Sequence, residues 1–106
     1  MNKTGDVKPF HGIQIQYFGA VRAAAKKSEE KVDFAVGITV YSLLRQVACN
    51  YENGFRGEIF DINGDELRDD LTVSLNGAII SRTDACETIL KQGDVLSLFP
   101  IFPGGG

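Results

Sequence analysis

The sequence has few of the residues that build metal, redox or disulfide sites. It contains two cysteines, one histidine and no tryptophan among 106 residues. Cys49 and Cys86 do not form a Cys-x-x-Cys pair and His11 is distant from both in sequence, which excludes a zinc site or an iron–sulfur cluster. We therefore predict no metal and no bound cofactor. Cys49 lies in a helical pattern and should be buried, whereas Cys86 should lie in a polar loop.

Long apolar runs and a basic surface are lacking as well. No stretch approaches the roughly 20 apolar residues of a membrane span, and the first residues contain no apolar signal segment. The absence of a signal and of a disulfide framework predicts a cytoplasmic protein with no membrane partner. A formal net charge of −3 argues against nucleic-acid binding, because phosphate contacts need a basic surface.

What the sequence does contain is four segments in which apolar and polar residues alternate, the pattern of half-buried strands. Their inward-facing residues should be Ile13, Ile15 and Tyr17; Val32, Phe34 and Val36; Leu71, Val73 and Leu75; and Leu96 and Leu98. Residues 19–29 are small and basic and should form the loop of an antiparallel hairpin. A short strand is expected at Ile59, Phe60 and Ile62, and residues 78–94 should be a loop with a helical turn at 85–88.

A helical period follows the second strand. Its apolar stripe consists of Val40, Leu43, Leu44, Val47 and Tyr51. Thr39 should cap its N-terminus and Asn53-Gly54 should end it, giving a helix over residues 39–52. The order β-β-α-β-β-β predicts an α+β protein with the β-grasp (ubiquitin-like) arrangement, a mixed sheet of four to five strands with one main helix packed across it. This domain should span residues 13–103, between a flexible arm (1–12) and a flexible glycine tail (104–106).

The segment "LFPIFPGGG", from Leu98 to Gly106, is unusual in composition. Three terminal glycines arise by chance with a probability of only about 0.03% at average glycine usage. Pro100 and Pro103 keep the chain extended, and glycine has no Cβ, so this end can enter a narrow enzyme cleft. The Gly106 carboxylate then becomes reactive once it is activated, for example as an acyl-adenylate.

Four features together resemble the ubiquitin-like sulfur-carrier family (MoaD/ThiS): "IQIQYFGAVR", "VSLNGAII", "LKQGDVLSLFP" and the terminal Gly-Gly. That family includes the small subunit of molybdopterin synthase and the thiamine-pathway sulfur carrier. The resemblance runs from about Ile13 to the end. "YFGAVR", "NG" after a strand, and "GD" before a strand ending in Phe-Pro are more similar to the molybdopterin branch.

The resemblance implies a reaction sequence carried out by partners. An E1-like adenylating enzyme would use ATP to activate the Gly106 carboxylate, with Gly105 beside it. A persulfide sulfur donor would then convert it to a thiocarboxylate, which delivers sulfur within the molybdopterin synthase large subunit. In the family the Phe-Pro element is followed by three residues and Gly-Gly, whereas here three glycines follow Pro103. Either Gly106 is the working residue or it is trimmed to expose Gly105.

A partner-binding role is predicted for the residues around the end of the last strand. Val95, Ser97 and Phe99 should lie opposite the core leucines and form a partly exposed patch, a feature typical of protein interfaces. The predicted partner-binding residues are Phe99, Pro100, Ile101, Phe102 and Gly104.

Other functions remain open at this point. The same carboxylate can join a ubiquitin-like modifier to a lysine of a target protein. The sulfur acceptor can be a tungsten cofactor, a tRNA or a thiamine-type product instead of molybdopterin. A non-catalytic β-grasp binding module with an incidental tail is a further alternative. An enzyme acting alone is disfavoured, because no nucleophile–base pair is visible.

Overall fold

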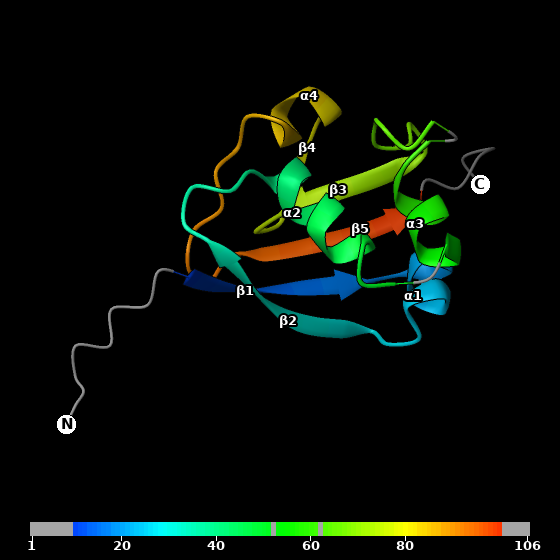
Figure 1. Ribbon diagram of the computed structural model, residues 1–106, viewed down its shortest axis with the longest axis horizontal. Helices are drawn as coiled ribbons and strands as arrows, with labels where there is room; N and C mark the ends of the chain where they lie inside the picture. Colours follow the sequence, from blue (N-terminus) through cyan, green and yellow to red (C-terminus); the bar gives the residue numbers. More distant parts are fainter. Residues whose placement is uncertain (1–9, 52, 62, 101–106) are drawn as a thin grey trace.

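The computed structural model describes residues 10–51, 53–61 and 63–100. Nine elements follow one another along these residues (Figure 1). They are β1 (Phe10–Tyr17), α1 (Gly19–Ala25), β2 (Glu29–Ala35), α2 (Val40–Ala48), α3 (Asn53–Ile59), β3 (Leu71–Leu75), β4 (Ala78–Ile80), α4 (Arg82–Ala85) and β5 (Val95–Pro100).

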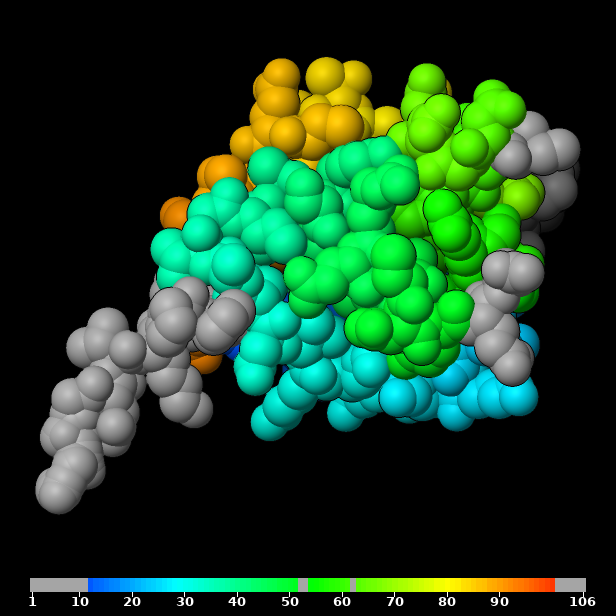
Figure 2. All heavy atoms as spheres, viewed as in Figure 1, coloured from blue at the N-terminus to red at the C-terminus, as the bar shows by residue number. Residues whose placement is uncertain are grey.

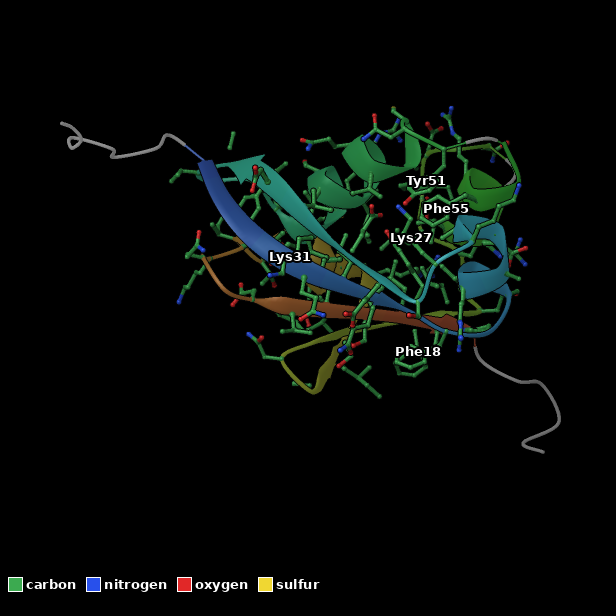
Figure 3. All side chains as sticks on the ribbon, turned by 90° about the horizontal axis from the view of Figure 1, so that it is seen from below. Phe18, Lys27, Lys31, Tyr51 and Phe55 are labelled. Atoms are coloured by element: carbon green, nitrogen blue, oxygen red, sulfur yellow. The ribbon has the colours of Figure 1, made fainter. Side chains whose placement is uncertain are left out.

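The strands form one mixed sheet in the order β2-β1-β5-β3-β4. β1 and β5 are parallel, and all the other neighbours are antiparallel. Helices α2 and α3 lie on one side of this sheet, as Figure 3 shows from below. In Figure 2 the atoms of β2, α2 and α3 almost hide β1 on that side. The prediction of an α+β, β-grasp fold with a mixed sheet is confirmed.

The core fills the space between the sheet and α2. The inward residues Ile15, Leu96 and Leu98 are fully buried in the central strands β1 and β5. The predicted helical stripe is buried against them at Val40, Leu43, Leu44 and Val47. Burying each such side chain stabilises the fold by roughly 1.5–3 kcal/mol. Thr39 caps α2 as predicted, because its Oγ1 accepts a hydrogen bond of 3.1 Å from the Ser42 amide.

The segment predicted as a hairpin loop is instead helix α1. Its sequence, GAVRAAA, is rich in alanine, the strongest helix former, and Val21 and Ala25 are buried one turn apart. The helix begins at Gly19 with φ at 58° and ends against Lys26, which has a left-handed φ of 63°. The seven residues of α1 are mostly alanine, with one arginine, so they show neither alternation nor a clear apolar stripe.

The predicted helix over residues 39–52 is correct as far as Ala48 but extends too far at its C-terminal end. Helix α2 ends at Ala48, and Asn53-Gly54 begins helix α3 rather than ending α2. Phe55 and Ile59 are buried one helical turn apart and hold α3 to the core. The strand predicted around Ile59 is reduced to one bridge between Phe60 and Leu67, and Ile62 lies outside the described residues.

Residues 78–94 contain more regular secondary structure than predicted: a short strand, β4, and a short helix, α4. Asn76 and Gly77 have φ values of 52° and 90°, and they turn β3 into β4. Ser81 caps α4, which spans residues 82–85 and lies earlier than the helical turn predicted at 85–88. A strand of three residues is too short for alternation to reveal it.

Three further predictions about position need correction. Val36 lies beyond the end of β2 and is 59% exposed, so it is not a core residue. Cys49 caps the C-terminus of α2 and is exposed rather than buried; Cys86 is exposed too. β1 begins at Phe10, so residues 10–12, predicted to belong to the arm, form part of the sheet.

Candidate partner-binding site

The site predicted around the end of β5 is described as far as Pro100. Leu96 and Leu98 are fully buried, while Val95, Ser97 and Phe99 are half-buried on the opposite side of the strand, as predicted. β5 lies between β1 and β3 at the centre of the sheet, which fixes the direction of these side chains. The other predicted site residues, Ile101, Phe102 and Gly104–Gly106, lie outside the described residues.

Phe18 lies beside Phe99, although Phe18 is not among the predicted site residues. The two rings meet edge to face, with centroids 5.9 Å apart. The Phe18 amide donates a hydrogen bond of 3.0 Å to the Leu98 carbonyl, so its backbone is tied to β5. Phe18 is 45% exposed on the sheet face away from Tyr51 and Phe55 (Figure 3). The available signal was alternation: Tyr17 faces inward, so the next residue must face outward.

Ile79 adds a third apolar side chain to this outer face. It is 72% exposed on β4 and pairs in register with Ser74, which pairs in turn with Ser97 of β5. Ile79 is not recognisable from the sequence, because the three residues of β4 are too few to show alternation. We call Phe18, Ile79 and Phe99 together the apolar docking surface. Exposed apolar groups with polar neighbours are typical of protein interfaces.

Apart from Val95, the outer side of β5 and the neighbouring part of β1 carry polar side chains. Ser97 Oγ donates a hydrogen bond of 3.1 Å to Gln16 Oε1, and Gln14 Nε2 donates one of 2.8 Å to Glu29 Oε1. Beyond these, at the start of β5, an open depression of about 390 Å³ is lined in part by Lys31, Asp33 and Gln92. The outer face therefore carries aromatic side chains near Pro100 and polar or charged side chains near the start of β5.

A half-buried carboxylate, Glu30, holds the end of β1 that precedes Phe18. Glu30 Oε2 accepts hydrogen bonds from the hydroxyls of Tyr17 and Tyr51, the second at 2.6 Å. Lys27 Nζ lies 3.4 Å from Glu30 Oε1 and 5.6 Å from the centre of the Tyr51 ring. Phe55 packs on both tyrosine rings. Figure 3 shows Lys27, Tyr51 and Phe55 together near α1.

These contacts shift the ionisation of the cluster. Burial, followed by the hydrogen bond to Glu30, raises the pKa of Tyr17 and of Tyr51 above the ordinary tyrosine value. Burial alone would raise the pKa of Glu30, but the hydrogen bonds from the two tyrosines and the nearby Lys27 charge outweigh it and lower that pKa. Glu30 is therefore an ionised acceptor that ties together β1, β2 and the segment after α2.

Among the described residues, no group of three or more His, Cys, Asp or Glu side chains could hold a metal ion. Within the same part of the chain, no helix has the length and apolar character needed to cross a membrane.

Comparison with known proteins assigns the family. A family model described as "ThiS family" matches residues 15–105. The Haloferax volcanii HVO 2177 protein is 26% identical in sequence, with a TM-score of 0.78 over 97% of this chain and 94% of that one. Small archaeal modifier protein 1 (SAMP1) from Methanosarcina acetivorans is 25% identical, with a TM-score of 0.74 over 91% and 98%. A Pyrococcus furiosus protein described as a putative molybdopterin converting factor, subunit 1, shares the fold at 24% identity, with a TM-score of 0.67 over 87% and 99%. No curated protein matches the sequence.

Proposed function

Because the chain belongs to the ThiS family, we propose that it is a ubiquitin-like sulfur carrier whose terminal glycine carboxylate becomes a thiocarboxylate. The observation that carries this proposal is the family match over residues 15–105, which takes in both the docking surface and most of the glycine tail. The chain contributes a reactive end and a binding surface, and partner enzymes supply the catalysis.

The proposed chemistry takes place at the Gly106 carboxylate. Its oxygen attacks the α-phosphate of ATP in an E1-like enzyme, and pyrophosphate leaves. The terminal sulfur of a persulfide donor then attacks the acyl carbon and displaces AMP. A second thiol cleaves the resulting acyl disulfide by attacking its outer sulfur, which leaves the thiocarboxylate on the glycine. A tail without Cβ atoms suits this chemistry, because the nucleotide and the enzyme backbone can approach it closely.

The position of the tail explains why partners should bind at the apolar docking surface. Six residues separate Pro100 from the Gly106 carboxylate, and six extended residues span at most about 21 Å. An enzyme that holds this carboxylate in its active site must therefore contact the region around the end of β5. Among the described residues, Phe18, Phe99 and Pro100 are apolar side chains near that end, and Ile79 lies on the same face of the sheet in β4. Ile101, Phe102 and Gly104 belong to the proposed contact as well.

We further propose that the thiocarboxylate serves molybdopterin synthesis, with the large subunit of the synthase as the second partner. The resemblance of "YFGAVR" and "GDVLSLFP" to the molybdopterin branch supports this assignment. The fold shared with the Pyrococcus furiosus molybdopterin converting factor is consistent with it.

Protein modification is the second candidate. It is favoured by the similarity to the Methanosarcina acetivorans protein, which is described as a small archaeal modifier protein. In that case a lysine of a target attacks the activated Gly106 carboxylate and an isopeptide bond forms, with AMP as the leaving group.

One experiment separates the two candidates. The protein is incubated with an E1-like enzyme from the same organism and ATP, with and without a persulfide donor, and its C-terminal peptide is examined by mass spectrometry. A sulfur carrier yields a free peptide in which sulfur replaces one oxygen, only when the donor is present. When cell lysate is added as a source of target proteins, a modifier yields a C-terminal peptide linked to a lysine of another protein, and this product forms without the persulfide donor.

A further inference from the structure

One hydroxyl on the outer face, that of Ser74 in β3, has no hydrogen-bond partner among the described residues. Ser74 is 7% exposed and is the buried polar residue among those that the structure describes. It points to the outer face, because its neighbours Val73 and Leu75 in β3 point to the other one. Within residues 10–51, 53–61 and 63–100, its Oγ donates no hydrogen bond and accepts none. Buried hydroxyls in proteins are paired in the large majority of cases, so this one needs an explanation.

The surroundings of Ser74 place the hydroxyl within the proposed interface. It lies between Ser97 of β5 and Ile79 of β4, its two partners in the sheet register. Ser97 Oγ already donates to Gln16 Oε1 but keeps its acceptor lone pairs. Two adjacent hydroxyls thus lie next to the apolar docking surface, and that of Ser74 has both its donor and its acceptor capacity unused.

We propose that Ser74 is a specificity-determining residue that hydrogen-bonds a polar group of the E1-like adenylating enzyme docked on this face. The inference rests on the proposed function, since the tail requires that enzyme to cover the end of β5. A partner's backbone amide or polar side chain that enters between Phe99 and Ile79 gains a hydrogen bond from an already desolvated hydroxyl. A purely apolar partner surface gains no such hydrogen bond, so the residue favours partners that carry a polar group at this position.

The test compares binding and stability in the same variants. Ser74→Ala and the size-matched Ser74→Cys are measured for affinity to the adenylating enzyme by calorimetry and for Tm by thermal unfolding. We expect an affinity loss of roughly fivefold to tenfold, the usual effect of one hydrogen bond. We expect no fall in Tm, because the hydroxyl has no partner to lose within the fold. Ser42→Ala, on α2 at the opposite side of the sheet, is the control for binding and should leave the affinity unchanged. Its Tm is not compared, because Ser42 Oγ accepts a hydrogen bond of 3.1 Å from Thr39 Oγ1.

Two results would overturn the proposal while leaving the proposed function intact. One is an unchanged affinity for both Ser74 variants under conditions in which Phe99→Ala weakens binding. The other is a Tm that falls by several degrees in Ser74→Ala, which would assign the hydroxyl a role inside the fold. If the wild-type protein does not bind the adenylating enzyme at all, the proposed function fails and this inference fails with it.

Discussion

The ring of Phe18 packs edge to face against the ring of Phe99, with an interplanar angle of 86°. One residue comes from the corner between β1 and α1 and the other from the penultimate position of β5, eighty-one positions later in the chain. Tyr17, immediately before Phe18, points into the core and is only 1% exposed. The corner thus separates two neighbouring aromatic residues: Tyr17 is part of the core, and Phe18 is part of the proposed docking surface.

We expect Phe99→Ala to weaken binding to the adenylating enzyme by at least tenfold, as the loss of an aromatic anchor commonly does. Its Tm should stay within a few degrees of the wild type, because the ring is only half-buried on the outer face. Calorimetric titration and thermal unfolding measure the two effects. Val36→Ala, which removes an apolar side chain that is 59% exposed outside the docking surface, is the control. Unfolding of Phe99→Ala would show that Phe99 is a core residue.

The corner itself depends on Gly19, whose φ is 58°. A side chain at this φ costs about 1–2 kcal/mol, so Gly19→Ala should lower the free energy of unfolding by about that amount. Gly57→Ala is the matched control: Gly57 lies inside α3, and an added Cβ meets no atom within 4 Å. This second variant should gain roughly 0.5–1 kcal/mol from helix propensity. Equal effects of the two substitutions in denaturant unfolding would contradict the assignment of Gly19.

The Glu30 cluster predicts a specific dependence of stability on pH. Because the pKa of Glu30 is lowered in the folded protein, the unfolded chain binds a proton more readily. The stabilisation by this carboxylate is therefore complete above the ordinary glutamate pKa and is lost as the pH falls through the folded value. Glu30→Gln should lower the free energy of unfolding at pH 7 by roughly 2 kcal/mol, since charged hydrogen bonds contribute about that much.

Urea unfolding at several pH values between neutral and acidic measures this effect. The difference between wild type and Glu30→Gln should shrink as the pH falls. Glu87→Gln, at an exposed position after α4, should show no difference at any of these pH values. A Glu30→Gln difference that persists unchanged in acid would contradict the role of the ionised carboxylate.

Local sequence signals predicted the elements whose patterns are long. The stripe from Val40 to Val47 and its Thr39 cap identified α2, and strict alternation identified β1 and β5. The Asn53-Gly54 pair led to a wrong prediction, because the same pair can end one helix or begin another. Only the burial of Phe55, which lies within α3, decides between the two. Ile79 and Ser74 became recognisable through strand register, which brings together residues far apart in sequence. Phe18 became recognisable through its ring contact with Phe99.

The central claim is that the terminal glycine carboxylate carries sulfur, and intact-mass analysis tests it most directly. The protein is incubated with its E1-like enzyme, ATP and a persulfide donor, beside a control variant extended by one alanine after Gly106. We predict that one oxygen is replaced by sulfur in the C-terminal peptide of the wild type and that the extended variant stays unmodified. Sulfur found only after loss of Gly106 would assign the reaction to Gly105. A C-terminal peptide that the enzyme, ATP and donor leave entirely unchanged would contradict the account.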